Sequence, residues 1–211
     1  MQSELLNKQH LIVFGGSFDP PHQAHVALPQ KVMQHLNADG IVYIPVGVPP
    51  HKPNRSLTPT TQRLAMLDLA LQNQPHTYVW TDEIDRAAQG DPTYTIDTLR
   101  RLGNQLDPQT QLRLLIGGDQ LRDFDTWKSY QTIEQLAEPV VMVRPPDNTT
   151  TLLDALPAGF DPRVWQSRLI EIPAMNISST LIRQRVANGQ SIAGWVDPKV
   201  EKYILEQGLY Q

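Results

Sequence analysis

Short apolar runs alternate with longer amphipathic segments along most of the 211-residue chain. Short apolar runs are typical of strands buried on both faces, whereas apolar residues three or four positions apart indicate helices. The alternation predicts an α/β fold with a parallel sheet covered by helices on both faces. The expected strands are residues 11–14, 41–45, 78–81, 112–116, 140–143 and 169–172.

The helical segments carry several start and stop signals. Pro29 lies inside the first helical pattern, so that helix either kinks at the proline or begins after it. Thr58 and Pro59 are typical of an N-cap and a first helical residue. Residues 147–168 are weakly patterned and are expected to form a variable loop. Further helices are expected from Thr95, up to Leu136, over 179–188 with Gly189 as a cap, and over 198–207.

Composition limits the partners of the chain. A formal net charge of −4 argues against duplex DNA and anionic membranes as partners. The absence of cysteine excludes disulfides, thiolate metal sites and a cysteine nucleophile. The N-terminal MQSELLNKQH lacks the apolar core of a signal peptide, and no apolar run approaches the length of a membrane span. We therefore expect a cytoplasmic protein. The sequence does not determine its oligomeric state, and a homo-oligomer is one possibility.

Residues 15–25 read GGSFDPPHQAH and directly follow the first expected strand. A strand, a glycine-rich turn and a helix bring free backbone N–H groups to one point, where the helix dipole also attracts anions. The glycine spacing matches neither the G-x-G-x-x-G fingerprint nor the P-loop. His22 and His25 are three residues apart, so on a helix they share one face. The stretch predicts an anion site beside two histidines.

Three interpretations of this histidine pair remain open from the residues alone. A metal site would need a third ligand, and the pattern lacks the glutamate of H-E-x-x-H. The pair could also be two surface or capping histidines. Histidines that donate hydrogen bonds to phosphate oxygens suit the turn best, so we assign no metal ligands.

The stretch resembles the G-x-F-D-P-x-H-x-G-H motif of nucleotidyltransferases related to class I aminoacyl-tRNA synthetases. Four more stretches extend the resemblance to bacterial nicotinate-nucleotide adenylyltransferases, in that family's order and as far as the C-terminal QGLY. They are VPPHKP at 48–53, PTYTIDTL at 92–99, IGGDQLRDFDTWKSY at 116–130 and ISSTLIR at 177–183. Ala24 departs from the pattern, because the family usually has glycine there, and it adds one methyl group beside the turn.

The resemblance implies adenylyl transfer from ATP to nicotinate mononucleotide, with Mg²⁺ accompanying ATP, in NAD synthesis. The products would be nicotinate adenine dinucleotide and pyrophosphate, formed by direct in-line attack without a covalent intermediate. The attacking phosphate has a second pKa near about 6, so it is ionised at neutral pH and needs no general base. Catalysis then means aligning two polyanions and stabilising charge on the α-phosphate and the leaving group. We expect a Rossmann-like, doubly wound single domain over 1–211, with a small helical part over about 177–211.

The expected catalytic residues are His22, His25 and Arg183. In ISSTLIR, Ser178 can cap a helix whose next turn brings the Ser179 hydroxyl and the Arg183 guanidinium to one face. The alternative is an ordinary capped helix with a surface arginine. Asp119 ends a strand at the carboxyl edge of the sheet, where it would accept from ribose hydroxyls or cap a helix. The expected ATP-binding residues are Gly15, Gly16, Ser17, Phe18, Gly117, Asp119, Ile177, Ser178, Ser179 and Thr180.

Five residues are expected on the mononucleotide side. By resemblance, Trp127 stacks on the pyridine ring, and the backbone N–H groups of Thr95 and Lys128 face its carboxylate. His51 and Lys52 lie in a proline-rich loop and would meet the mononucleotide phosphate, if they are not simply solvated loop residues.

Two rival functions belong to different classes. A sibling adenylyltransferase would act on nicotinamide mononucleotide or phosphopantetheine, although TYTIDTL and DTWKSY argue against phosphopantetheine. A catalytically silent nucleotide sensor would not need His22, His25 and Arg183 together, so their presence argues against it.

Overall fold

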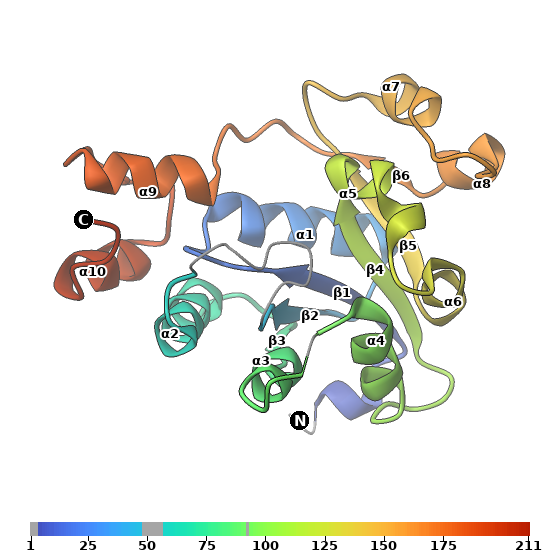
Figure 1. The fold of residues 1–211 in the computed structure, drawn as a ribbon, viewed down its shortest axis with the longest axis horizontal. Coiled ribbons are helices and arrows are strands. Elements are labelled where there is room, and N and C mark those ends of the chain that lie inside the picture. The colour runs from blue at the N-terminus through green and yellow to red at the C-terminus, as the bar shows by residue number, and fades with distance from the viewer. Residues whose placement is uncertain (1–3, 48–56, 92) are drawn as a thin grey trace.

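The computed structural model of the protein describes residues 4–47, 57–91 and 93–211. One six-stranded sheet forms its centre, in the order β3-β2-β1-β4-β5-β6, and every neighbouring pair is parallel (Figure 1). All six predicted strands are confirmed, with ends that differ by at most two residues. They are β1 (His10–Gly16), β2 (Gly40–Pro45), β3 (Thr77–Val79), β4 (Gln111–Gly117), β5 (Glu138–Val143) and β6 (Leu169–Glu171).

Helices cover both faces of this sheet, as a parallel sheet requires. One layer contains α1, α2 and the C-terminal pair, and the other contains α4 and α6 (Figure 1). The helices are α1 (Gln23–Leu36), α2 (Thr60–Leu71), α3 (Asp82–Ala87), α4 (Thr95–Gly103), α5 (Gly118–Arg122), α6 (Tyr130–Leu136), α7 (Thr149–Asp154), α8 (Pro162–Gln166), α9 (Ser179–Ala187) and α10 (Pro198–Glu206), with 3₁₀ turns at Leu5–Asn7 and Phe124–Thr126.

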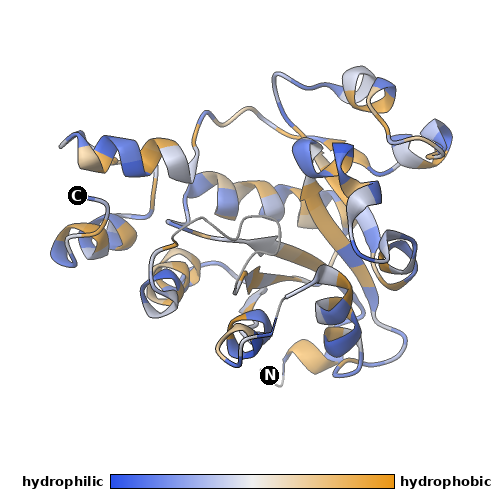
Figure 2. Ribbon diagram, viewed as in Figure 1, coloured by the Kyte–Doolittle hydropathy of each residue, from blue (hydrophilic) through white to orange (hydrophobic). Residues whose placement is uncertain are grey.

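Successive side chains of β1 point to opposite faces of the sheet and so pack into both helical layers. Ile12 and Phe14 pack into the core under α1 and α2, while Leu11 and Val13 pack into the core under α4. All four side chains are buried, and the central strands are accordingly the most apolar part of the ribbon (Figure 2). The predicted Rossmann-like, doubly wound α/β architecture is confirmed. Within the described ranges, no helix is both long and apolar enough to cross a membrane.

One of the two alternatives for the first helix is excluded, and the expected start of the second helix is wrong. Helix α1 starts at Gln23 and runs through Pro29, so it does not begin after the proline. Helix α2 begins at Thr60 with Pro59 as its N-cap. Thr58 is therefore not the cap; it lies one residue before it, where its N–H donates to a carboxylate oxygen of Asp19 at 3.3 Å.

Two segments with weak or incomplete patterns in the sequence form defined secondary structure. Residues 147–168 are not an unstructured loop, because they contain α7 and α8. The helical stretch expected up to Leu136 is divided into α5, a 3₁₀ turn and α6. The expected cap at Gly189 is confirmed by its left-handed backbone, φ 65°, and by its N–H bond to the carbonyl of Val186.

Candidate active site

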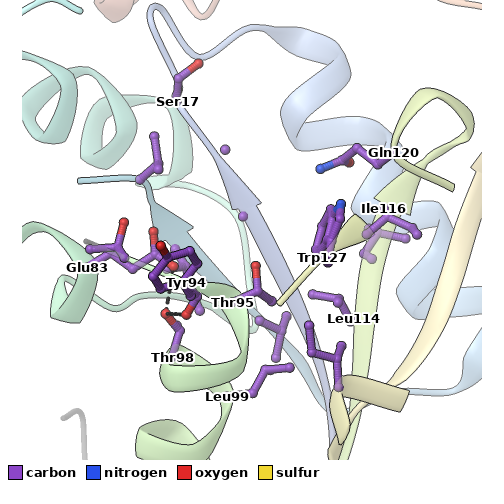
Figure 3. Close-up of a pocket in the computed structure, with 18 of the residues that line it drawn as sticks. Ser17, Glu83, Tyr94, Thr95, Thr98, Leu99, Leu114, Ile116, Gln120 and Trp127 are labelled. Carbon is purple, nitrogen blue, oxygen red and sulfur yellow. Dashed lines mark hydrogen bonds between the residues drawn. The ribbon is translucent and has the colours of Figure 1, made fainter. Parts of the chain in front are cut away.

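The strand order reverses between β1 and β4, and a cavity of about 310 Å³ opens at this point. Open α/β sheets bind ligands at such a position, outside the carboxyl ends of the strands. Figure 3 shows Trp127 on one side of the cavity and Tyr94, Glu83 and Thr95 on the other. Gly15, Gly16 and Ser17 at the end of β1 also line the cavity.

His22 and His25 are brought together at the start of α1, just beyond the β1 turn. His22 is the N-cap residue and His25 is the third residue of the helix. Their rings stack with centroids 3.6 Å apart and planes 19° apart. The backbone N–H of His22 donates to Nδ1 of His25 at 3.3 Å. In a neutral His25 ring the proton therefore lies on Nε2, which is the atom free to donate.

Burial keeps both rings neutral. Desolvation, followed by the positive charge of Arg144, lowers the pKa of His22 to about 4. Burial lowers the pKa of His25 well below its ordinary value, and His22 and Arg144 add to the effect. A neutral imidazole with a lowered pKa is a weak base that still offers one N–H donor, which suits contacts with phosphate oxygens that are already charged.

A proline and a tyrosine fix the backbone of His25. Because Pro29 has no N–H, the carbonyl of His25, four residues earlier, lacks its helical donor. The hydroxyl of Tyr43, a fully buried residue on β2, donates to that carbonyl at 3.0 Å. The proline that looked like a helix breaker is thus accommodated by a bond from the neighbouring strand.

Phe18 turns inward from the glycine-rich stretch. It has a left-handed backbone, φ 47°, and its ring is fully buried against Phe14, Tyr43 and His25. A Cβ on Gly16 would lie 2.9 Å from the Phe18 ring, so glycine leaves room for it. Any contact of Phe18 with ATP would therefore fall to its backbone.

The turn after β1 is held by α9. Ser178 caps α9, and its hydroxyl accepts from the N–H of Leu181 at 3.2 Å, which confirms that prediction. Ser179 and Arg183 share one face, as expected. The Ser179 hydroxyl donates to the carbonyl of Pro20 at 2.8 Å, and Nη1 of Arg183 donates to the carbonyl of Asp19 at 2.7 Å.

The neighbouring positions of the same motif are more open. Ile177 packs partly against the core, and Thr180 is exposed, where its hydroxyl accepts from Nη2 of Arg183 at 3.2 Å. The motif therefore brings the polar groups of Ser179 and Arg183 to the β1 turn, and Arg183 is not an isolated surface residue.

A buried arginine organises the same turn from the other side. Only 1% of Arg63 is exposed, and its guanidinium donates to three main-chain carbonyls. These belong to Ser17 at 2.9 Å, Val46 at 3.0 Å and Thr58 at 3.1 Å. The sequence analysis missed Arg63, because these three partners lie in different segments.

Asp119 lies at the carboxyl edge of the sheet but does not cap a helix. The N-cap of α5 is Gly117, and Asp119 is the second helical residue. Its side chain is 75% exposed and lies 3.8 Å from Nη2 of Arg144, which follows β5. A Cβ on Gly117 would come within 2.5 Å of this carboxylate, so glycine permits its position.

Three of the five expected mononucleotide residues line the cavity, from two parts of the chain. Thr95 is the first residue of α4, and Trp127 and Lys128 follow the 3₁₀ turn. Trp127 is partly buried and packs against Phe124 with ring centroids 5.3 Å apart. Nζ of Lys128 lies 3.1 Å from the carboxylate of Asp97, so its charge is already paired.

A buried network holds the start of α4. The Thr98 hydroxyl donates to Glu83 at 2.8 Å and accepts from Arg86 at 2.7 Å. Arg86 also forms an ion pair with Asp82, with Nε of Arg86 2.8 Å from Oδ2 of Asp82. Burial raises the pKa of Glu83, a carboxyl group that lines the cavity. The sequence analysis missed this network, although the charged stretch TDEIDR precedes PTYTIDTL.

Comparison with known proteins gives the family. Residues 13–185 match the cytidylyltransferase-like family model. A probable nicotinate-nucleotide adenylyltransferase of Thermomicrobium roseum is 36% identical over 201 residues, covering 94% of this chain and 90% of that protein. A second, from Albidiferax ferrireducens, is 38% identical over 202 residues, covering 94% and 96%. The chain belongs to the nicotinate-nucleotide adenylyltransferase family.

Solved structures agree with this assignment at the level of the fold. A Plasmodium falciparum nicotinic acid mononucleotide adenylyltransferase complexed with NaAD has a TM-score of 0.75 and 20% identity, covering 96% of this chain and 97% of its own. The resemblance to nicotinate-nucleotide adenylyltransferases drawn from the sequence is therefore confirmed.

His51 and Lys52 lie outside the described residues. Among the described residues, no group of three or more His, Cys, Asp and Glu side chains could hold a metal ion. The histidine pair accordingly has no third ligand in that part of the chain.

Proposed function

We propose that this protein transfers the adenylyl group of ATP to nicotinate mononucleotide, releasing nicotinate adenine dinucleotide and pyrophosphate. The observation that carries the proposal is the β1 turn, which lies between the cavity with Trp127 and the stacked histidines. A mononucleotide in the cavity would reach the turn with its phosphate, and ATP would meet the turn from the side of His22 and α9.

The chemistry follows from this placement. An oxygen of the mononucleotide phosphate attacks the α-phosphorus of ATP, and the bond to the β-phosphate oxygen breaks as pyrophosphate leaves. Neutral His25 would donate through Nε2 to the phosphate oxygens, and Arg183 would offset the developing negative charge. The Gly15 to Ser17 turn would hold both phosphates close enough for in-line attack.

A divalent cation is part of the proposal, with Mg²⁺ as the ion. Asp19, a buried carboxylate in the turn after β1, already accepts from Tyr210 and Thr58, and Asp119 pairs with Arg144. These partners suit an ion that arrives on the triphosphate and keeps much of its water. When bound, such an ion neutralises phosphate charge. We expect chelation of divalent ions to stop turnover and added Mg²⁺ to restore it.

Pyrophosphate release from Mg·ATP tests the proposal against its rivals. The acceptors are nicotinate mononucleotide, nicotinamide mononucleotide and phosphopantetheine, each added alone. We expect the highest kcat/KM with the nicotinate compound. Release with phosphopantetheine alone would identify a sibling enzyme, and ATP binding without release from any acceptor would identify a nucleotide sensor.

A further inference from the structure

The end of the described chain folds back onto the β1 turn. After α10, Gly208 and Tyr210 take left-handed backbone conformations, φ 59° and 64°, which reverse the chain. Leu209 is buried in the same core as α1 and α2. The hydroxyl of Tyr210 then donates to Oδ1 of Asp19 at 2.7 Å, across 191 residues of sequence.

Asp19 connects this tyrosine to the catalytic arginine. It is only 2% exposed, and its second carboxylate oxygen accepts from the N–H of Thr58 at 3.3 Å. Its main-chain carbonyl accepts from Nη1 of Arg183 at 2.7 Å. Asp19 therefore accepts a hydrogen bond from Tyr210 on its side chain and one from Arg183 on its backbone carbonyl.

We propose that Tyr210 is a positioning residue for adenylyl transfer: its hydroxyl fixes Asp19, and the Asp19 carbonyl fixes the guanidinium of Arg183 at the phosphate turn. This inference rests on the proposed function, because it assigns Arg183 to the transferred phosphate. Tyr210 itself touches neither substrate in this arrangement.

The strength of the contact supports such a role. A hydroxyl that donates to a carboxylate makes a stronger hydrogen bond than one between neutral groups. Burial raises the pKa of Tyr210, so the hydroxyl keeps its proton across the neutral range. Without it, the Asp19 carboxylate would keep, among the described residues, the bond from Thr58, and Asp19 would lose one of the contacts that fix its position. A misplacement of about 1 Å can lower turnover by about 10²-fold, so we expect a smaller shift of the guanidinium to lower it by about tenfold.

The experiment is a double-mutant cycle of Tyr210→Phe and Arg183→Ala, with kcat and both KM values measured. Tyr203→Phe is the matched control, because Tyr203 is a partly buried tyrosine on α10 packed against the same core. We expect Tyr210→Phe to lower kcat about tenfold with both KM values within twofold of wild type. In the Arg183→Ala background it should change kcat by less than twofold, because the group it positions is gone.

Each other outcome overturns a stated part of the reasoning. If Tyr210→Phe lowers only the melting temperature, or if its effect multiplies with that of Arg183→Ala, Tyr210 stabilises the fold and does not position Arg183. If Tyr203→Phe lowers kcat equally, the effect belongs to the α10 segment as a whole. A wild type with no turnover on any mononucleotide would refute the proposed function and this inference together, whereas an active wild type with an unaffected Tyr210→Phe variant refutes the inference alone.

Discussion

Replacing Arg63 by methionine tests how the β1 turn is built. The methionine keeps an apolar stem of similar length but removes the guanidinium that joins Ser17, Val46 and Thr58. Three buried or half-buried carbonyls would lose a charged donor, and each unsatisfied acceptor costs roughly 1–3 kcal/mol. Part of this is offset, because the folded state no longer has to bury the charge. From three such acceptors less this offset, we expect the free energy of unfolding to fall by about 3–5 kcal/mol.

Urea unfolding followed by circular dichroism measures this loss. For a chain of this size the same change corresponds to a lower melting temperature by roughly 6–20 °C. Arg163→Met is the matched control, because that side chain is 93% exposed, and it should change stability by less than about 0.5 kcal/mol. A loss below about 1 kcal/mol in Arg63→Met would show that the three carbonyls find other donors and that Arg63 does not organise the turn.

Three further predictions concern the site. His25→Ala should lower kcat by roughly 10²–10³-fold in steady-state assays with little change in mononucleotide affinity, because a transition-state donor is lost; near-normal turnover in a folded variant would refute its role. Lys128→Ala should keep most of the preference in kcat/KM for nicotinate over nicotinamide mononucleotide, because Lys128 is paired with Asp97, while Trp127→Ala should lower kcat/KM for both substrates. Loss of the preference in Lys128→Ala would show that the Lys128 side chain distinguishes the acid from the amide. As pH falls from 6.5 to 4, wild type should lose about 3 kcal/mol of stability through His22, because the pKa of this group is about 4 in the folded protein and about 6.5 in the unfolded chain, which therefore binds the proton at higher pH. In urea unfolding at both pH values, His22→Gln should lack that loss, and equal pH dependence of the two proteins would contradict the prediction.

Local hydrophobic patterns were sufficient to predict the sheet. The inner strands contain runs of buried apolar residues, such as Leu11 to Phe14 in β1, and burial on both faces is visible in the sequence as such a run. The edge strands β3 and β6 are shorter and only partly buried. The expected cap at Ser178 also rests on neighbouring residues alone, and it is confirmed. The helix start expected at Thr58 and Pro59 is one residue too early, because α2 begins at Thr60. Thr58 instead makes tertiary bonds to Asp19 and Arg63, which its sequence context does not reveal.

Site residues that lie in one contiguous motif could be predicted from the sequence, whereas residues whose partners are far away along the chain were missed. His22 and His25 are three residues apart, and their stacking follows from the start of one helix. Arg63 and Tyr210 reach the same turn from 46 and 191 residues away. Neither contact leaves a local periodicity, so only the folded chain reveals it. Pro29 is a similar case, since its compensating donor, Tyr43, lies on another element.

Product analysis tests the central claim most directly. Purified protein is incubated with Mg·ATP and nicotinate mononucleotide, and the products are separated and identified by mass spectrometry. The account predicts one nicotinate adenine dinucleotide and one pyrophosphate for each ATP consumed. Consumption of ATP without the dinucleotide, or binding of both nucleotides without any product, would contradict adenylyl transfer at this site.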